Sequence, residues 1–533
     1  MRYNNSNRST LLPVLLALTL AGGILIGIYL PKQNLITQNT GIRPRSDKIT
    51  NILNFIESDY VDSIDRKDLV EAAIPAILKN LDPHSVYIPA RELARANEPL
   101  QGNFDGIGIS FNILADTILV IGTIPGGPSE KLGLLPGDKI IYVNDSLVAG
   151  NRISDEQVMG MLKGPRGTTV TVKVLRRGHK DLIPFEITRD KIPITSVDVS
   201  YMVNEHTGYI RINNFAMTTY EEFMKGLREL KNEGMNRLIL DLRGNSGGVM
   251  DAAIQIANQF LKAGQLIVYT QGRAQPRNEA RATGKGEFET GELVILIDEY
   301  SASASEIIAG AIQDNDRGTI VGRRSFGKGM VQEPIQFSDG SGMRLTIARY
   351  YTPTGRSIQK PYNNGFDEYF DDLNLRFQRG ELGISDSIQF PDSLKFVTPG
   401  GRIVYGGGGI MPDVFVPVDT TGVSAYFVRV RPFIYQFALK FTEQHREVLR
   451  KYTRTRELET YLDNLGLLDQ FIRFAESAGI SRDTEGLRVS GRIIHTQIKA
   501  YIARNILDNK GFYPVWEQID TTLKYAINYL NKS

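Results

Sequence analysis

The distribution of apolar and polar residues divides the chain into five successive segments. An uncharged apolar run covers residues 11–30, which is close to the length that crosses a bilayer. Helical periodicity marks residues 46–96, and short β-type runs with glycine-rich turns mark residues 102–190. Apolar strands alternate with helices from about 194 to 420, and helical patterns dense in Glu, Lys and Arg occupy 424–533. We therefore expect a multidomain α+β protein.

The expected organisation is a membrane span, a helical N-terminal region, a small β-sandwich-like domain, an α/β core and an all-α C-terminal extension. A polar tether precedes the N-terminal helices, and a segment without apolar periodicity interrupts the α/β core. In chain order, the predicted boundaries are 1–30, 31–100, 101–191, 192–422 (with the insertion at 361–403) and 423–533.

The apolar run at 11–30 predicts an uncleaved membrane anchor. Arg2 and Arg8 precede the run, and only Lys32 follows it closely, which favours the bulk of the chain outside the cytoplasm. The alternative is a cleaved signal peptide, but the run is long for one and no small-x-small cleavage site ends it. We expect a cell-envelope protein held in the inner membrane, with the rest of the chain in the periplasm or otherwise outside the cytoplasm.

The composition removes several kinds of chemistry. The 533 residues include no cysteine, which excludes disulfides, thiolate catalysis and cysteine metal sites. The net charge of +2 gives no indication of a nucleic-acid partner. None of the five histidines lies in a context typical of a serine-protease histidine, and His84, beside Pro83, is interpreted as structural. No cluster of metal ligands is visible, so neither a metal nor an organic cofactor is expected.

Within these segments, individual elements can be predicted. In the β-rich segment, Thr168–Leu175 alternates like an edge strand. The expected core strands are Gly208–Ile212, Leu238–Asp241, Leu293–Ile297 and Gly318–Gly322, with helices at Thr219–Lys231 and Val249–Leu261. The extension predicts helices at Phe437–Tyr452, Glu457–Glu476 and Val515–Leu530, and no chemistry is visible in it.

Three turns of the α/β region carry candidate chemistry. A serine-rich turn, Tyr300–Glu306, follows one predicted strand, and the glycine-rich turn Arg243–Gly248 follows another. A third loop, Ser325–Gln332, places Lys328 between glycines, 25 residues after Ser303. Because sites in open α/β sheets form where strands end, these turns are expected to meet.

A serine hydroxyl needs a base to become a nucleophile, and a desolvated lysine can serve where no histidine does. Ser303 and Lys328 are therefore candidates, and the backbone amides at Gly247 and Gly248 could bind a developing oxyanion. The alternative is that the serines merely cap a helix and Lys328 is a solvated loop residue.

Other serines compete for the same role. Ser246 lies in Gly-Asn-Ser-Gly-Gly, which is similar to the surroundings of trypsin-like nucleophiles, but those enzymes need a histidine and a β-barrel framework. Ser301 and Ser305 flank Ser303, and Ser305 is better explained as a helix cap.

The β-rich segment resembles a PDZ domain. The resemblance rests on Leu134–Ile141 (Leu-Leu-Pro-Gly-Asp-Lys-Ile-Ile) and on Gly106, Ile107, Gly108 and Ile109. PDZ domains bind a peptide C-terminus as an added strand while loop amides receive its carboxylate. The alternative is that these glycines serve only a tight turn.

Residues 46–420 resemble the carboxyl-terminal processing peptidases, also called tail-specific proteases. Beside the PDZ-like unit, the matching motifs are Leu81-Asp-Pro-His-Ser85, Asp241-Leu-Arg-Gly-Asn-Ser-Gly-Gly248, Ser301-Ala-Ser-Ala-Ser-Glu306, Phe326-Gly-Lys-Gly329, Tyr351-Thr-Pro-Thr-Gly-Arg-Ser-Ile358 and Gly409-Ile-Met-Pro-Asp-Val414. The insertion and the helical extension lie beyond the common pattern, so expectations about oligomer shape and access do not carry over.

The resemblance implies a serine endopeptidase that cleaves C-terminal tails of exported proteins through an acyl-enzyme. Ser303 would be the nucleophile, Lys328 the general base, Gln332 the residue that orients it, and the amides of Gly248 and Ala304 the oxyanion hole. Gln332 is expected on the same side of a helical turn as Lys328. The implied partners are proteins or peptides with free C-termini. From the residues, the membrane is a further expected partner through residues 11–30, and a homodimer through the N-terminal helices or the C-terminal extension stays open. The alternative is a PDZ scaffold or chaperone with a protease-like fold that does not cleave.

Overall fold

The structure is a computed structural model that describes residues 19, 47–363, 365–384 and 391–532. The predicted anchor at 11–30 lies almost entirely outside these residues. Within the described ranges, no helix has both the length and the apolar character needed to span a membrane. The chain divides into two compact units after Ile74.

The first unit consists of helical segments near the N-terminus. Helix α2 covers Lys48–Asp59 and begins where the Asp47 carboxylate accepts a hydrogen bond from the amide of Ile49. Helix α3 covers Arg66–Leu78, and Arg66 forms an ion pair with Glu57 at 2.8 Å. The helices predicted for this region are confirmed.

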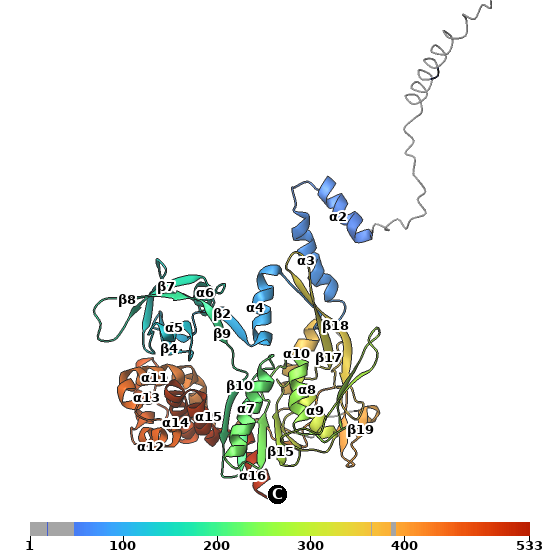
Figure 1. Cartoon of the computed structure of the whole chain (residues 1–533). Helices are drawn as coiled ribbons and strands as arrows, with labels where there is room; N and C mark the ends of the chain where they lie inside the picture. The colour runs from blue at the N-terminus through green and yellow to red at the C-terminus, as the bar shows by residue number, and fades with distance from the viewer. Residues whose placement is uncertain (1–18, 20–46, 364, 385–390, 533) are drawn as a thin grey trace, which may run out of the picture. The chain divides into compact units, whose positions relative to one another are not determined.

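The second unit begins at Pro75, within α3, and its helix α4 (Ala90–Gln101) leads into the PDZ-like domain, which is drawn in cyan in Figure 1. Its antiparallel sheet has the order β3-β4-β5-β7-β8, and a separate ribbon β2-β9 joins the segments that enter and leave the domain. The strands are β2 Asn103–Gly106, β3 Ile109–Leu114, β4 Thr117–Thr123, β5 Lys139–Val143, β6 Ser146–Leu147, β7 Thr169–Leu175, β8 Ile183–Thr188 and β9 Asp190–Pro193, with helices α5 Pro128–Lys131 and α6 Asp155–Leu162.

Two details of this domain matter for function. Strand β3 lies at the end of the sheet order, so one of its edges pairs with no other strand in the part of the chain that the structure describes. Strand β7 pairs with both β5 and β8, so the prediction that Thr168–Leu175 is an edge strand was wrong. Its alternating pattern arises because Val170, Val172 and Val174 all point into the core of this domain.

A six-stranded sheet forms the centre of the α/β core, with the order β10-β11-β12-β15-β16-β21. All neighbouring strands are parallel except β10, which pairs antiparallel with β11. The strands are β10 Val197–Met202, β11 Thr207–Ile212, β12 Arg237–Asp241, β15 Glu292–Ile297, β16 Thr319–Gly322 and β21 Val414–Phe415, and the helices are α7 Thr219–Asn232, α8 Met250–Asn258 and α9 Ala304–Asp314. The predicted core strands and helices are confirmed, with small shifts at their ends.

A second sheet contributes the lysine-bearing loop. It contains β1 Val86–Ile88, β18 Gly342–Tyr351, β13 Leu266–Gln271 and β14 Asn278–Arg281 in that order, and β17 Met330–Gln336 also pairs with β18. The described part of the insertion is not irregular throughout. It contains α10 Phe366–Gln378, the short 3₁₀ helix η2 Asp392–Leu394 and the strand β19 Lys395–Val397, which pairs with β20 Ile403–Tyr405.

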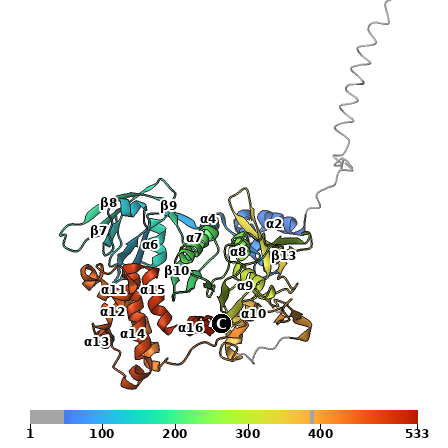
Figure 2. The ribbon, with the colours of Figure 1, turned by 60° about the horizontal axis from the view of Figure 1, so that its bottom comes forward.

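The C-terminal extension forms a helical bundle with its own apolar core (Figure 2). Its helices are α11 Ala425–Leu449, α12 Thr455–Asp463, α13 Leu467–Ser477, α14 Thr484–Leu507, α15 Asn509–Trp516, η3 Glu517–Ile519 and α16 Thr521–Lys532. Two predicted helices, Glu457–Glu476 and Val515–Leu530, are each divided in two. Gly466 adopts a left-handed conformation before α13, and the short η3 turn separates α15 from α16.

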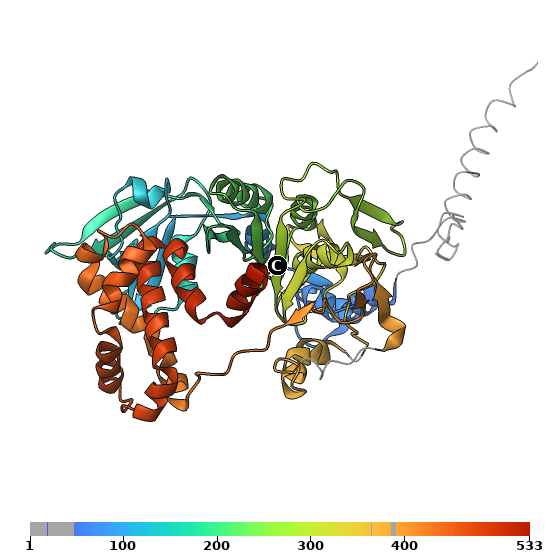
Figure 3. The same cartoon turned by 90° about the horizontal axis from the view of Figure 1, so that it is seen from below.

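The extension is also part of the α/β core. Helices α7, α8 and α9 cover one face of the central sheet, whereas Leu523, Ala526 and Leu530 of α16 pack on residues of the opposite face, including Tyr209 and Ile239. Figure 3 shows this last helix beside the strands of the sheet. Alternate residues of each strand are therefore buried on opposite faces. The same extension contacts the PDZ-like domain, where Asn112 Nδ2 of β3 donates to the Tyr435 hydroxyl at 2.7 Å.

Candidate active site

Ser303 occupies a strained turn between strand β15 and helix α9. Its φ of 55° and ψ of −110° lie outside the regions that a serine adopts without cost, and it stands at the N-cap of α9. Every residue of α9 is buried, so the helix is firmly held while Ser303 at its start is only partly buried. A strained strand-to-helix turn that presents a hydroxyl is a geometry suited to a nucleophile.

The two neighbouring serines are structural. Ser301 and Ser305 are fully buried, and their hydroxyls donate to the carbonyls of Leu242 at 2.8 Å and Asn245 at 2.9 Å, respectively. The prediction that Ser305 caps the helix was wrong, because the N-cap position belongs to Ser303. Of the three hydroxyls in this turn, the Ser303 hydroxyl is the one left at a partly exposed position.

The glycine-rich turn after β12 lies directly against Ser303. A Cβ atom on Gly247 would come within 2.7 Å of the Ser303 Cβ and 3.0 Å of the Ala304 amide nitrogen. A Cβ on Gly248 would lie 2.0 Å from the Phe215 carbonyl oxygen. Both glycines have positive φ, 100° and 142°, so only glycine fits here. Gly247 thus packs on the Ser303 turn next to the amide of Ala304, one of the two amides predicted to form an oxyanion hole.

Asn245 fixes the two turns to each other. Its carbonyl accepts from the Ala302 amide at 3.0 Å and from the Ser305 hydroxyl at 2.9 Å. Its side chain donates to the Ile212 carbonyl and accepts from the Gly247 amide, both at 2.9 Å. Since Asn245 is fully buried, these bonds form in a medium where they are strong.

Lys328 lies in the loop that leads into β17. Burial lowers the pKa of its ammonium group below the ordinary value, and the positive charge of Arg344 lowers the pKa further. Its Nζ donates to Gln332 Oε1 at 3.3 Å. A lysine with a depressed pKa and one hydrogen-bonded orienting group meets the requirements of a general base.

Gln332 reaches Lys328 by a different route from the one expected. It lies in strand β17, not on a helical turn, so the predicted helical spacing was wrong. The register of β17 against β18 shifts between Val331 and Gln332. The Gln332 amide nitrogen donates to the backbone carbonyl of His84, so the orienting amide is itself held.

The Asp-Pro-His-Ser motif supports this arrangement. The carboxylate of Asp82 accepts from the amides of His84 and Ser85 at 2.8 and 3.0 Å and from the Thr346 hydroxyl at 3.0 Å. It therefore ties the motif to β18. His84, which was predicted to be structural, has a pKa lowered to about 4, first by burial and then by the charge of Lys328. It is a neutral neighbour of the lysine at physiological pH.

Glu306 joins the nucleophile turn to the lysine loop. Its carboxylate, fully buried, accepts from the Ser303 amide at 2.8 Å and from the Lys328 amide at 2.9 Å. It also accepts from the Gly327 amide at 2.7 Å and the Ser325 hydroxyl at 2.5 Å. Burial raises its pKa to about 7, although these hydrogen bonds oppose the shift. The sequence interpretation assigned Glu306 no role, and its place in the Ser-x-x-Glu capping-box pattern was the available signal.

Tyr350 adds a second link between the same two segments. Its buried hydroxyl lies 3.0 Å from the Ser303 carbonyl and 2.5 Å from the Lys328 carbonyl. No hydrogen bond joins Ser303 Oγ to Lys328 Nζ in the described part of the chain. The backbones of the two residues are thus locked together, whereas their side chains do not make the contact that proton transfer requires.

The insertion contacts the lysine loop through α10. Arg376 donates to the Ser325 carbonyl at 2.8 Å and the Phe326 carbonyl at 3.1 Å. The hydroxyl of Tyr369 lies 2.7 Å from His84 Nε2, and the Lys360 ammonium lies between the Phe326 and Tyr369 rings. The insertion is therefore part of the wall around Lys328.

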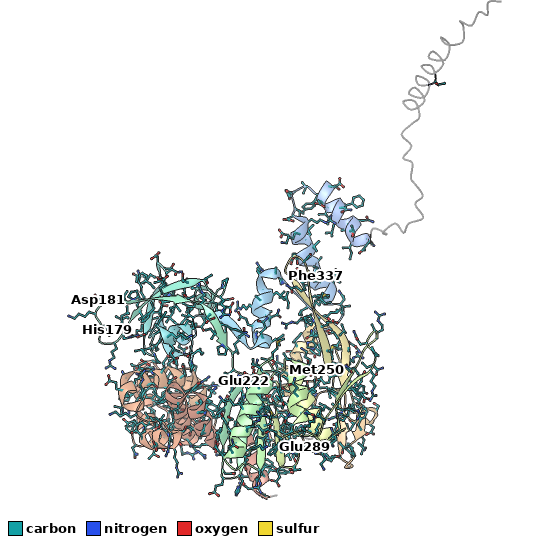
Figure 4. All side chains as sticks on the ribbon, in the orientation of Figure 1. His179, Asp181, Glu222, Met250, Glu289 and Phe337 are labelled. Carbon is teal, nitrogen blue, oxygen red and sulfur yellow. The ribbon has the colours of Figure 1, made fainter. Side chains whose placement is uncertain are left out.

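The competing trypsin-like reading of Ser246 has no support. Ser246 is exposed, and among the described residues no histidine forms a hydrogen bond with its hydroxyl. His179, for example, lies on the exposed loop between β7 and β8 (Figure 4). The described ranges also contain no group of three or more His, Cys, Asp or Glu residues that could hold a metal ion.

The predicted peptide-binding residues form the loop between β2 and β3. Gly108 has a φ of 72°, and the carbonyls of Ile107 and Gly108 accept from the amides of Ser129 and Ile124 at 3.2 and 2.9 Å. Ile109 begins β3, whose outer edge is unpaired. The loop therefore stands at the start of an open strand, as PDZ-type binding requires.

Comparisons with known families match four separate parts of the chain. Residues 206–366 match peptidase family S41, and residues 106–187 match the PDZ domain. Residues 31–91 match the N-terminal domain of the activating protease CtpB. Residues 426–508 match a family of unknown function.

Curated relatives cover much of the chain. The carboxy-terminal processing protease CtpB of Bacillus subtilis is 34 % identical over 319 residues, which are 59 % of this chain and 65 % of the relative. The carboxy-terminal-processing protease of Bartonella bacilliformis is 36 % identical over 314 residues, which are 58 % of this chain and 71 % of the relative. The chain thus spans slightly less than two thirds of the first relative.

Solved structures give a weaker likeness. The photosystem II D1 C-terminal processing protease is 26 % identical, with a TM-score of 0.37. The matched part makes up 70 % of this chain and 87 % of that protease's chain. A peptide complex of the PDZ domain of the Vibrio cholerae carboxy-terminal protease is 29 % identical with a TM-score of 0.16, covering 17 % of this chain and 97 % of its own.

Proposed function

This chain belongs to peptidase family S41, among the carboxy-terminal processing proteases, and we propose that it is a serine endopeptidase that cleaves C-terminal tails with a Ser303–Lys328 dyad. One observation carries this proposal. Ser303 is partly exposed and lies against the glycine-rich turn. The buried carboxylate of Glu306 accepts hydrogen bonds from the backbone amides of both Ser303 and Lys328.

The proposed reaction begins when Ser303 Oγ attacks the carbonyl carbon of the scissile peptide bond. Lys328 Nζ, neutral at the start, takes the hydroxyl proton, and the amides of Gly248 and Ala304 donate to the oxyanion. The carbon–nitrogen bond then breaks as Lys328 returns its proton to the leaving amine. Water attacks the resulting ester with Lys328 again as base, which releases the acid and restores the Ser303 hydroxyl.

The resting side chains must move before this reaction can start. Lys328 Nζ donates to Gln332, and Ser303 Oγ is not among its partners in the described structure. We propose that the lysine or serine side chain rotates to form this contact while Glu306 holds both backbone amides. Catalytic hydrogen bonds are often long or absent without substrate.

We propose that the PDZ domain supplies the substrate. A free C-terminus would add as a strand at the open edge of β3, with its carboxylate at the amides of the Gly106–Ile109 loop. Proteins or peptides with accessible C-termini are therefore the proposed substrates.

The test is cleavage of an unfolded protein by the purified chain beside Ser303→Ala and Lys328→Ala, with Ser246→Ala as the matched control. We expect the unmutated chain and Ser246→Ala to cleave and the other two to be inactive. If the unmutated chain binds the unfolded protein but cleaves no faster than Ser303→Ala, it is a non-cleaving scaffold or chaperone instead.

We also propose that residues 11–30 anchor the enzyme in the inner membrane, with its catalytic part in the periplasm, and that two copies form a homodimer. The uncharged run and the basic residues before it support the anchor, and the N-terminal helices and the C-terminal extension are the surfaces proposed for the homodimer. An alkaline wash of membranes distinguishes an anchored chain from a released one, and light scattering of the detergent-solubilised protein gives its oligomeric state. A chain found only in the wash supernatant would exclude the anchor.

A further inference from the structure

The C-terminal extension reaches the glycine-rich turn through one residue. Asp520 lies just before helix α16, and its two carboxylate oxygens accept from Arg243 NH1 and NH2 at 2.9 and 2.7 Å. Arg243 is the second residue after strand β12 and directly precedes the segment Gly244–Gly248 of the glycine-rich turn. A bidentate arginine–carboxylate pair fixes both distance and orientation.

Arg243 is held from its other side by the core. Its Nε and NH2 donate to the oxygens of Asp241 at 2.9 and 2.6 Å, and its carbonyl accepts from Arg211 at 2.9 Å. Its side chain is 13 % exposed, as is that of Asp520, so the pair is largely shielded from water. The guanidinium thus sits between one carboxylate of the core and one of the extension.

The surroundings give Arg243 room to move if Asp520 is lost. A cavity of ≈ 380 Å³ lies at this junction and is lined by both residues together with Arg211 and Trp516. An arginine that loses one of two buried partners can relax into such a space, and the turn that begins with it would move as well. Displacements of this kind far from the reacting atoms lower turnover.

Asp520 has a second role that can be separated from the first. One of its oxygens accepts from the Leu523 amide at 2.9 Å, which caps helix α16. Asn is as good a cap as Asp, so Asp520→Asn retains the cap while it removes the charge and one acceptor from Arg243.

We propose that the C-terminal extension positions the oxyanion-hole turn, and that Asp520 is the positioning residue through which it acts on Arg243. The proposal rests on the function proposed above for its effect on catalysis. Its structural part, the hold on residues 244–249, does not depend on that function.

The test uses the full chain and three variants: Asp520→Asn, Arg243→Lys and the double variant. Asp463→Asn is the matched control, because Asp463 pairs with Lys499 inside the extension at 2.7 Å. Hydrogen exchange of the peptide containing residues 244–249 is measured together with kcat and KM for a short fluorogenic peptide and the melting temperature.

We expect Asp520→Asn to speed exchange of the 244–249 amides and to lower kcat about five- to tenfold with KM unchanged. Asp463→Asn should change neither the exchange of the 244–249 amides nor kcat. In the Arg243→Lys background, adding Asp520→Asn should lower kcat by less than about a further twofold. Unchanged exchange in Asp520→Asn overturns the proposal. So does unchanged kcat in an enzyme that cleaves, or a lower kcat that merely follows a lower melting temperature. If the unmutated chain does not cleave the peptide, the proposed function is wrong. The hydrogen exchange of residues 244–249 then still shows whether Asp520 holds the turn in place.

Discussion

The two sides of the candidate active site are built in different ways. On the nucleophile side, the parts are backbone amides and a strained serine, which lie within the two turns Arg243–Gly248 and Tyr300–Glu306. On the base side, they are side chains from three distant segments: Lys328 and Gln332 of the lysine loop, His84 of the N-terminal motif, and Tyr369 of the insertion. The first side is specified locally, and the second depends on the assembled fold.

This difference teaches which parts of the site are fixed at rest. On the nucleophile side, Gly247 already packs on Ser303 and lies next to the Ala304 amide nitrogen. The base side holds Lys328 against Gln332 and away from Ser303. Catalysis would therefore be limited by rearrangement on the base side, and changes there should sharpen the comparison most.

The largest effect is expected from Lys328→Met, which keeps the length of the side chain but removes the base. We expect kcat to fall by about 10³- to 10⁴-fold, since general-base catalysis and serine activation are both lost. Lys225→Met, an exposed lysine of α7, is the matched control. A Lys328→Met enzyme that retains more than a tenth of the activity would show that another group takes the proton.

Lys328→Met should raise the stability of the folded chain although it lowers the activity. Because the folded-state pKa of Lys328 is lowered, protonation is less favourable in the folded chain than in the unfolded one. Lys328 therefore lowers the free energy of unfolding as pH falls through its folded-state pKa. We expect Lys328→Met to melt at a higher temperature than the unmutated chain below that pH, and a lower melting temperature would contradict the assigned burial.

A large effect is also expected from Glu306→Gln, which acts on both sides at once. An amide in place of the carboxylate turns one acceptor into a donor that faces N–H groups, so kcat should fall by roughly 10²-fold. The exposed Glu333→Gln of β17 is the control. A variant as active as the unmutated enzyme would mean that the two segments hold together without Glu306.

Glu306 further predicts a pH dependence. Its folded-state pKa of about 7 exceeds the ordinary glutamate value of 4.5, so its contribution to stability is full below 4.5 and is lost as pH rises through about 7. Activity should change in the opposite sense and fall below about pH 7, because a protonated carboxyl accepts fewer hydrogen bonds. Calorimetry and initial rates between pH 5 and 9 measure both trends, and parallel trends would contradict this assignment.

A smaller effect is expected from Gln332→Ala on the base side alone. The lysine would lose its orienting acceptor but keep its burial, so kcat should fall about tenfold with little change in KM. Gln336→Ala, four residues further along the same strand and exposed, is the control. Equal activities of the two variants would exclude an orienting role for Gln332.

The smallest effect is expected from Arg344→Gln. Its positive charge lowers the pKa of Lys328, so removing that charge should raise the lysine pKa and move the acidic limb of the kcat/KM profile toward higher pH. The maximum rate should change little, because Arg344 otherwise bonds the Ala96 carbonyl and Asn97. A shift toward lower pH would contradict the electrostatic argument.

The two sides of the site differ in the kind of signal that the sequence carries for them. Strand and helix patterns with glycine turns are local signals, so Ser303 and the amides of Gly247 and Gly248 were candidates from the residues alone, whereas Ala304 came from the family resemblance. Gln332 was found by resemblance, but its position in β17 depends on pairing with β18, which no local pattern reveals. The roles of Glu306, Tyr350 and Tyr369 arise from contacts between segments that are distant in the chain.

The extension shows the same limit more strongly. Its helices were predicted from periodicity, yet the packing of α16 on the central sheet and the contact of Asp520 with Arg243 could not be. The packing and the contact both depend on a second apolar face of the sheet. Apolar strands in the sequence predict that such a face exists, but they do not predict which segment covers it.

The most direct test of the account is to identify which hydroxyl is acylated. The full chain is incubated with a peptide thioester, quenched in acid during turnover, digested and analysed by mass spectrometry. We predict one adduct on Ser303, lost in Ser303→Ala and strongly reduced in Lys328→Met. An adduct on Ser246, Ser301 or Ser305, or turnover that persists in Ser303→Ala, would contradict the assignment of Ser303 as the nucleophile.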